Sequence, residues 1–226
     1  MKNITLSILL TITLISQCSS LLIPKLPGYT LSENNSSLQV EVFLDPHCQD
    51  SSNFWTNFQD VLNQNISQEK TILDLISLKL HMFGLPYHHN SYLACKMLNY
   101  FEAKSPNEYI CFLDAMFTRR DYFNSGLTSH SIVYIQSEII SYGKGCLNKE
   151  DPNIDSVYSN SDIDLKARYD YKYASKKGIF SYPTILVNGF EQDLSGMNTD
   201  QIYDFFKDLI KSNNESKKEF ENGLDF

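Results

Sequence analysis

Apolar residues recur with two different periods along the chain, and each period predicts a different kind of element. The segment LQVEVFLD, residues 38–45, is rich in apolar and β-branched residues with partial alternation, which predicts a strand ending at a proline turn. Over residues 49–65 the apolar positions take helical spacing, and over residues 71–83 strand character returns. The chain therefore starts with a strand–helix–strand unit, which follows a polar lead over residues 21–37.

A long block of helical periodicity follows the second strand. Its apolar positions mark helices around residues 93–101, 105–117, 132–142 and 163–174. The sequence SPNE at 105–108 is an S-x-x-E capping box with Pro106 at the first helical position, so it predicts the start of the second helix. Gly143 and Gly145 are predicted to stop the third helix, and Gly178 the fourth.

The last third of the chain returns to strands before a final helix. The segment TILVNGF, residues 184–190, places an Asn-Gly turn after a β-branched run, which predicts a hairpin. Thr199 is predicted to cap the final helix, and residues 211–226 are predicted to be a polar disordered tail. Two β units separated by helices, without an internal repeat, indicate one α/β sheet domain with a helical subdomain.

Residues 1–20 have the pattern of a secretory signal peptide: Lys2, an apolar run over residues 4–15, and then small and polar residues. A lipoprotein signal ending at Cys18 is the alternative, and Gln17 before it disfavours that alternative because a small residue is expected there. No later stretch approaches the roughly 18 apolar residues that a membrane helix needs, so no membrane span is expected in the mature chain. The predicted localisation is the secretory pathway, as a secreted protein or in an endomembrane lumen.

The chain is acidic, with a formal net charge of −8 that becomes −9 without residues 1–20, because that segment carries Lys2 and no acid. An acidic chain without a basic cluster excludes nucleic acid as an expected partner. Four N-x-S sequons predict a glycoprotein where the host glycosylates. They start at Asn34, Asn35, Asn65 and Asn214.

Removal of the signal peptide leaves four cysteines: Cys48, Cys95, Cys111 and Cys146. An oxidising compartment favours pairing, and four cysteines allow three connectivities. Either two disulfides form and lock Cys48, or Cys48 stays free and the other three cannot all pair. Both arrangements are compatible with the sequence.

Cys48 is the first candidate for chemistry, because it follows a strand and stands at the start of a helix. Unpaired backbone N–H groups and the positive end of the helix dipole stabilise a thiolate there, and the thiolate is the species that attacks disulfides. Ser51, one helical turn on, is expected to donate a hydrogen bond to the sulfur but cannot replace a resolving thiol. His47, if protonated, would support the thiolate, whereas Asp50 would oppose it. The competing interpretation of Cys48 is a small buried residue at a helix start.

Histidines near Cys95 form a second, weaker candidate, for metal binding. His81, His88 and His89 show no C-x-x-C or H-x-x-x-H spacing, so a solvated turn is favoured over a metal site, and no metal is expected. The sequence contains no G-x-G-x-x-G, Walker loop or G-x-S-x-G, and its carboxylates form no recognisable pair.

Several motifs in matching order resemble one known family. A strand followed by D-P-x-C-x-x-S, a helical insertion, and then A-x-x-x-G-I-x-x-x-P-T-x-x-V-N-G over residues 174–189 is similar to the DsbA-like branch of the thioredoxin superfamily. The segment LHMFGLPYHHNSYLA, residues 80–94, resembles eukaryotic secreted members with F-x-D-P-x-C-P-D-S. The resemblance covers residues 38–210. It implies a thioredoxin-like α/β fold with a helical insertion at about residues 86–177.

The resemblance also assigns roles to residues and shows departures. It implies that Cys48 is the nucleophile, that Pro183 is a cis-proline facing it, and that Tyr182 offers its backbone to an extended substrate. Ser51 replaces the resolving cysteine of the family, Gln49 replaces the usual proline, and the histidine precedes the nucleophile instead of following it. These departures argue against a strong dithiol oxidase.

Three functions are compatible with these features. The first is monothiol thiol-disulfide exchange or isomerisation through Cys48, with cysteine-containing proteins or glutathione as partners, glutathione as co-substrate and no other cofactor. The second is a non-catalytic thioredoxin-fold module that binds peptides or proteins. The third is glutathione transfer or isomerisation on a kappa-type scaffold, in which a serine activates the glutathione thiol.

Overall fold

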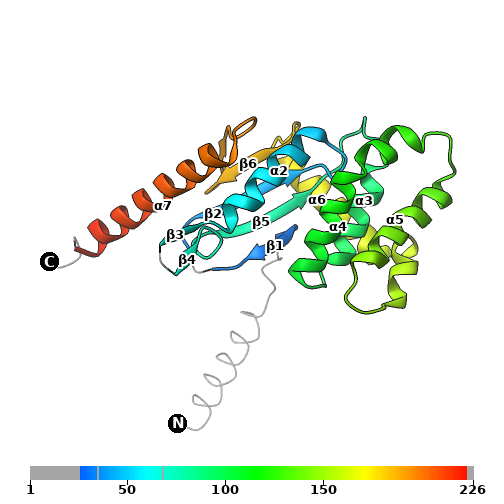
Figure 1. Ribbon diagram of the computed structural model, residues 1–226, viewed down its shortest axis with the longest axis horizontal. Coiled ribbons are helices and arrows are strands. Elements are labelled where there is room, and N and C mark those ends of the chain that lie inside the picture. The colour runs from blue at the N-terminus through cyan, green and yellow to red at the C-terminus, as the bar shows by residue number, and fades with distance from the viewer. Residues whose placement is uncertain (1–25, 35, 68, 223–226) are drawn as a thin grey trace, which may run out of the picture.

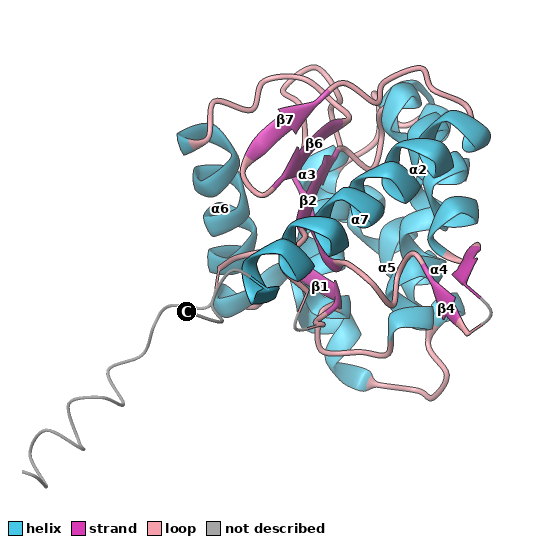
Figure 2. Ribbon diagram, turned by 90° about the vertical axis from the view of Figure 1, so that its left-hand side faces the viewer, coloured by secondary structure: helices cyan, strands magenta, loops and turns pink. Residues whose placement is uncertain are grey.

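The computed structural model describes residues 26–34, 36–67 and 69–222, with side chains as far as residue 217. The predicted signal peptide and the sequon at Asn35 lie outside the described residues. A five-stranded mixed sheet in the order β1-β5-β2-β6-β7 forms the centre, and helices cover both of its faces (Figures 1 and 2). Its strands are β1 (Tyr29–Ser32), β2 (Gln39–Leu44), β5 (Ser77–Met82), β6 (Thr184–Val187) and β7 (Phe190–Gln192).

Strand β2 lies in the middle of the sheet and is apolar on both faces. It runs parallel to β5 and antiparallel to β6. Val40, Val42 and Leu44 belong to the larger core cluster, while Phe43, on the opposite face, belongs to a second and smaller one. All four are at most 1% exposed. Because both faces of β2 are covered, the sequence of the strand alternates only partially.

Two helices cover the face of the sheet that carries the larger cluster. These are α2 (Gln49–Leu62) and α7 (Thr199–Asn222), which pack against each other. Phe58 of α2 and Phe206 of α7 are fully buried, and their ring centroids lie 5.6 Å apart. Helix α6 (Ser161–Lys176) lies against the opposite face, next to β5 (Figure 2).

The predicted helical insertion forms a separate layer beside the sheet (Figure 1). Its elements before α6 are α3 (Ser91–Phe101), α4 (Pro106–Thr118), the π-helical turn η1 (Tyr122–Gly126), α5 (Ile132–Cys146) and the 3₁₀ helix η2 (Pro152–Ser159). The predicted capping box at the start of α4 is confirmed, since Ser105 and Glu108 cap each other's backbone N–H. The π-helical and 3₁₀ turns were not predicted from the sequence.

The polar lead over residues 21–37, in which no element was predicted, contains a strand. Residues Tyr29–Ser32 form edge strand β1, which pairs antiparallel with β5, and Tyr29 is only 7% exposed. The predicted strand over residues 71–83 is also shorter than expected, because β5 begins at Ser77. A small hairpin, β3 (Asn65–Ser67) and β4 (Lys70–Thr71), precedes it. Both differences involve short strands. Strand β1 pairs with β5, which is distant in the sequence, and β3 pairs with β4 across a tight turn.

Helix ends differ from the prediction in two places. Helix α5 continues through Gly143 and Gly145 to Cys146, so these glycines do not stop it. The final helix starts with a side-chain cap from Asn198, whose Oδ1 accepts from Gln201 N–H at 3.0 Å, and not from Thr199.

The polar tail predicted to be disordered from residue 211 is helical as far as Asn222. Residues 211–217 are mostly exposed, so helical polar residues here extend α7 beyond its last buried residue, Ile210. Charged residues with good helix propensity can continue a helix that packing has already started.

Candidate functional site

Cys48 stands where β2 ends and α2 begins. It is the N-cap residue of α2, with extended backbone angles, and its carbonyl accepts the first helical hydrogen bond from Ser52 N–H at 3.0 Å. The thiol is free, and the residue is 7% exposed. Cys48 therefore stands at the positive dipole end of a 14-residue helix, and its side chain makes no capping hydrogen bond to the backbone N–H groups there.

Ser51 is fully buried one turn into the same helix. Its Oγ accepts a hydrogen bond from the backbone N–H of Asp45 at 3.1 Å. The serine therefore ties the first turn of α2 to the turn that follows β2. Donation of its hydroxyl hydrogen to the Cys48 sulfur stays a prediction.

Asp45 organises the turn that presents Cys48, a role that the sequence did not reveal. Its carboxylate is fully buried and accepts from the N–H groups of His47 at 2.8 Å and Leu85 at 2.7 Å, and from the Ser91 hydroxyl. His88 Nδ1 lies 2.7 Å from the same carboxylate. A single side chain thus connects the turn before α2, the loop after β5 and the start of α3. Asp45 lies 40 to 46 residues before Leu85, His88 and Ser91, so only the fold brings it to them.

His47 cannot supply the positive charge that the sequence suggested. Its ring is 1% exposed and stacks on Phe123 of η1, with centroids 5.4 Å apart. Burial, and to a lesser degree the charge of His88, lowers the pKa of His47 to about 3, so the imidazole is neutral near pH 7. Asn124 of η1 donates from Nδ2 to the His47 carbonyl at 2.9 Å, which fixes the backbone just before Cys48. Asp50 is exposed in the first turn of α2.

The peptide bond between Tyr182 and Pro183 is cis, just before β6. Tyr182 is 7% exposed and belongs to the same buried cluster as Cys48, together with Phe43 and Phe83. Its ring centroid lies 5.5 Å from that of Phe83. Burial raises the pKa of the Tyr182 phenol. Segments about 135 residues apart in sequence, at Cys48 and at Tyr182–Pro183, therefore meet in one apolar cluster.

The other cysteines fall into two groups. Cys111 of α4 and Cys146 at the end of α5 form a disulfide that joins these two helices. Cys95 of α3 is free, like Cys48, but is 1% exposed, and burial raises the pKa of its thiol. Of the two arrangements left open by the sequence, the structure has the one in which Cys48 is unpaired.

The histidines are held by partners other than a common metal. His88 contacts Asp45, and His81 is fully buried with its Nε2 3.1 Å from Glu41 Oε2. Among the residues that the structure describes, no group of three or more His, Cys, Asp or Glu side chains is arranged to hold a metal ion. The described helices also include none that is long and apolar enough to cross a membrane.

The fold is similar to those of solved bacterial proteins. A putative protein-disulfide isomerase from Pseudomonas syringae matches with a TM-score of 0.60 and 19% identity, over 80% of this chain and 97% of its own. BdbD from Bacillus subtilis, in its oxidised form, matches with a TM-score of 0.61 and 14% identity, over 81% and 93%. Chlamydia trachomatis DsbA matches with a TM-score of 0.55 and 14% identity, over 80% and 88%.

These similarities define the class of structure. The chain has a DsbA-like thioredoxin fold with a helical insertion, as predicted from its motifs. At the level of sequence, no protein-family model and no curated protein matches it.

Proposed function

We propose that the protein catalyses thiol-disulfide exchange or isomerisation through Cys48 as a monothiol. The observation that carries this proposal is a free cysteine at the N-terminus of α2, in one cluster with the tyrosine that precedes a cis-proline. The fold similarity to a putative protein-disulfide isomerase, BdbD and DsbA supports the same reaction class. Ser51 occupies the position where a second thiol would be needed for an internal disulfide.

The reaction requires no cofactor. The Cys48 thiolate attacks one sulfur of a substrate disulfide, so that a Cys48–substrate disulfide forms and the other substrate sulfur leaves as a thiolate. That thiolate either takes up a proton or attacks a second disulfide of the substrate, which forms a new disulfide and releases a different substrate thiolate. When the released thiolate attacks the mixed disulfide and frees Cys48, the substrate disulfides have been rearranged, which is isomerisation. Otherwise an external thiol, from glutathione or a protein, attacks the mixed disulfide and releases Cys48. No net oxidation occurs at the enzyme.

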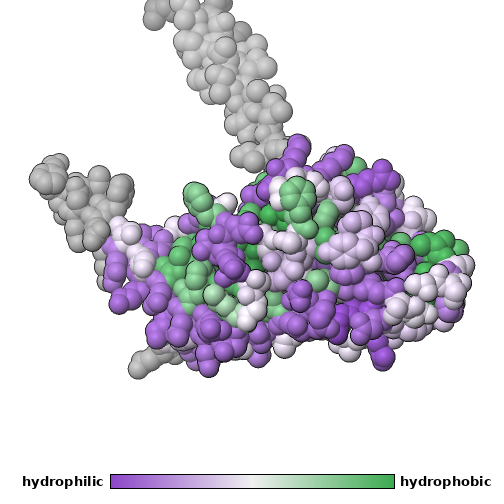
Figure 3. Space-filling view, turned by 90° about the horizontal axis from the view of Figure 1, so that it is seen from above, coloured by the Kyte–Doolittle hydropathy of each residue, from purple (hydrophilic) through white to green (hydrophobic). Residues whose placement is uncertain are grey.

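The residues around Cys48 have separate tasks in this proposal. Ser51 positions the first turn of α2 and stabilises the thiolate, while Tyr182 and Pro183 hold an extended substrate segment by its backbone. Phe180, two residues before Tyr182, is 79% exposed, and Tyr87 in the loop after β5 is 65% exposed. Figure 3 shows apolar surface along the middle of one face of the molecule, between polar areas. Exposed aromatic side chains such as Phe180 and Tyr87 suit an unfolded or extended protein segment as the substrate.

We also propose that the protein works in an oxidising compartment of the secretory route. The signal-peptide pattern and the Cys111–Cys146 disulfide both fit this location. Of the sequons, Asn65 and Asn214 are exposed and suit glycosylation. The Asn34 amide instead donates to Ser32 Oγ at 2.8 Å and to two backbone carbonyls, and a glycan would disrupt this arrangement because it replaces one of the two amide hydrogens.

Mixed-disulfide trapping tests the proposed reaction. The wild type, incubated with a cysteine-containing peptide disulfide, should form a covalent adduct at Cys48, which mass spectrometry of a non-reduced digest locates. Cys48→Ser should lose the adduct, whereas Cys95→Ser, which removes the other free thiol, should keep it. An adduct that persists in Cys48→Ser would rule out the mechanism. The rate of alkylation of Cys48 as a function of pH reports on the same thiol.

A second candidate function is peptide binding without turnover. The observation in its favour is that Cys48 is only 7% exposed, which restricts access to the sulfur. In that case a peptide lacking cysteine would bind as tightly as its cysteine-containing counterpart, and Cys48→Ser would bind both unchanged. Tighter binding of the disulfide form that depends on Cys48 would favour exchange instead.

A further inference from the structure

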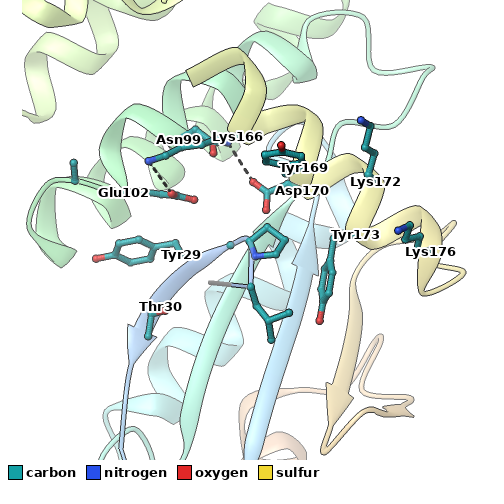
Figure 4. A pocket seen from close by; sticks show the side chains of 14 residues that line it. Tyr29, Thr30, Asn99, Glu102, Lys166, Tyr169, Asp170, Lys172, Tyr173 and Lys176 are labelled. Atoms are coloured by element: carbon teal, nitrogen blue, oxygen red, sulfur yellow. Dashed lines mark hydrogen bonds and ion pairs between the residues drawn. The ribbon is translucent and has the colours of Figure 1, made fainter. Parts of the chain in front are cut away.

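A large cavity lies between the lead into β1 and helix α6, and the proposed reaction at Cys48 makes no use of it. Its volume is about 820 Å³, which is within the usual range for small-molecule sites. Residues 26–30, the end of α3 with the two residues that follow it, and one face of α6 form its walls (Figure 4). Gly28 has a φ of +95°, and a Cβ there would lie 2.6 Å from His81 Nδ1, so only glycine lets the chain lie this close to the sheet.

Two side chains at the inner end of the cavity have acceptor atoms without a donor. Asp170 of α6 and Asn99 of α3 are 2% and 3% exposed, and both line the cavity. Asn99 Nδ2 donates to Asp170 Oδ2 at 3.3 Å. Within the part of the chain that the structure describes, Asp170 Oδ1 and Asn99 Oδ1 then have no hydrogen-bond partner. His81 Nδ1 lies within ion-pair distance of Asp170 Oδ1, at 3.9 Å, which is too long for a hydrogen bond.

The surroundings of these acceptors are negative. Glu102 also lines the cavity, with the Lys166 ammonium 3.5 Å from its carboxylate. Burial and the charge of Glu102 both raise the pKa of Tyr29, which lines the cavity as well. For Tyr109, which stacks on Tyr29, burial raises the pKa most, and Glu102 and Asp170 raise it further. Burying a carboxylate without a full set of hydrogen-bond donors destabilises the folded state. A bound cation with N–H groups would supply the missing donors and offset this loss of stability.

Aromatic rings stand on both sides of Asp170. Figure 4 shows the carboxylate projecting from α6 into the space between Tyr29 and Tyr173, with Tyr169 next to it. The faces of such rings attract organic cations. Lys172 and Lys176 extend from the outer side of α6, away from Asp170 (Figure 4). Neither lysine therefore occupies the position beside Asp170 Oδ1.

We propose that this cavity binds a small organic molecule with a primary ammonium group on an apolar or aromatic body. The ammonium group donates to Asp170 Oδ1 and Asn99 Oδ1, and the body lies between the tyrosine rings. An anion is excluded at the inner end, because both orphan atoms accept hydrogen bonds and neither donates. The proposal does not depend on the reaction at Cys48, so Cys48→Ser should bind the amine like the wild type.

A series of three probes of similar shape separates charge from shape. The probes are 2-phenylethylamine, 2-phenylethanol and 3-phenylpropionate, titrated into the full mature chain by calorimetry or by two-dimensional NMR. The amine should bind saturably and at least about tenfold more tightly than the alcohol, because a hydrogen bond to a charged group is worth more than a neutral one. The acid should not bind. Equal affinity for amine and alcohol, or no saturable binding of the amine at millimolar concentrations, would overturn the proposal and leave water as the partner of the acceptors.

Variants locate the site. Asp170→Asn should weaken amine binding about tenfold or more. The matched control is Asp162→Asn, which makes the same change at an exposed position in the first turn of the same helix and should change binding less than twofold. Ala103→Trp adds bulk at an exposed cavity-lining position and should block binding even if Asp170→Asn folds poorly. Amine affinity that is unchanged in both Asp170→Asn and Ala103→Trp would place the binding elsewhere and refute the assignment.

Discussion

At the scale of single residues, His47 lies next to the proposed nucleophile but is a buried residue of the core. Its neutral ring is buried against Phe123, and neither ring nitrogen has a hydrogen-bond partner within the described residues. A histidine that is neutral when buried but can be protonated in the unfolded chain makes the free energy of unfolding depend on pH.

The pKa of His47 is lowered from 6.5 to about 3 on folding, so between these values the unfolded chain binds a proton that the folded chain does not. Stability therefore falls as the pH drops below about 6.5, and His47→Phe should remove this loss, which amounts to about 2 kcal/mol between pH 7 and pH 5. Urea unfolding at the two pH values measures it. His130→Phe, at an exposed histidine, is the control and should lose as much stability on acidification as the wild type. An unchanged pH dependence in His47→Phe would mean that the ring is protonated in the folded protein.

At the scale of elements, helix α5 contains two glycines, both predicted to end the helix, that differ in their packing. Its two glycines are two positions apart, both within the helix. A Cβ added to Gly143 would lie 2.9 Å from Ile154 Cδ1 of η2, whereas a Cβ added to Gly145 would have no neighbour within 4 Å. Gly143 therefore permits the close approach of η2 to α5, whereas no element that the structure describes packs close enough to Gly145 to require a glycine there.

Glycine-to-alanine substitutions at the two positions should therefore differ. Gly145→Ala should raise the free energy of unfolding by up to about 1 kcal/mol, through the higher helix propensity of alanine. In Gly143→Ala the same gain is offset by the displacement of the fully buried Ile154, so this variant should be less stable than Gly145→Ala by about 1 kcal/mol or more. Urea unfolding of both variants side by side gives the difference. Equal effects would show that Ile154 moves without cost.

At the scale of the whole molecule, the helical insertion and the sheet are stabilised in different ways. The sheet is covered by helices on both faces, whereas α4 and α5 are joined by the disulfide between Cys111 and Cys146, 35 residues apart. Closing a loop of this length restricts the unfolded chain, and this entropy effect stabilises the folded state by about 4 kcal/mol.

Cys111→Ser with Cys146→Ser should lower the free energy of unfolding by about 3 to 4 kcal/mol. Chemical unfolding of the double variant, compared with the oxidised wild type, measures this loss. Because neither cysteine belongs to the cluster around Cys48, trapping at Cys48 should continue under conditions in which the variant is folded. A stability equal to that of the oxidised wild type would mean that the disulfide does not constrain the chain.

Much of the fold was predictable because it depends on local patterns. The central strand, α2, the capped α4 and the Asn188-Gly189 hairpin each carry their signal within a few residues, and the positive φ angles of 49° and 84° at that turn confirm the predicted hairpin. Strand β1 was missed because four residues that pair with β5 leave little local pattern. Cys48 and Ser51 were proposed from their positions at a predicted helix start, whereas Tyr182 and Pro183 were assigned only through motifs that resemble a family.

The sequence by itself determined the order of the elements, the α/β class and the position of Cys48 at the start of a helix, because periodicity and caps are properties of neighbouring residues. Only the tertiary structure decided which cysteines pair, that His47 is neutral and that Asp45 holds three segments. It alone brought Asp170 and Asn99 to the end of a cavity. These outcomes depend on burial and on distances between residues far apart in the chain, and no local pattern encodes them.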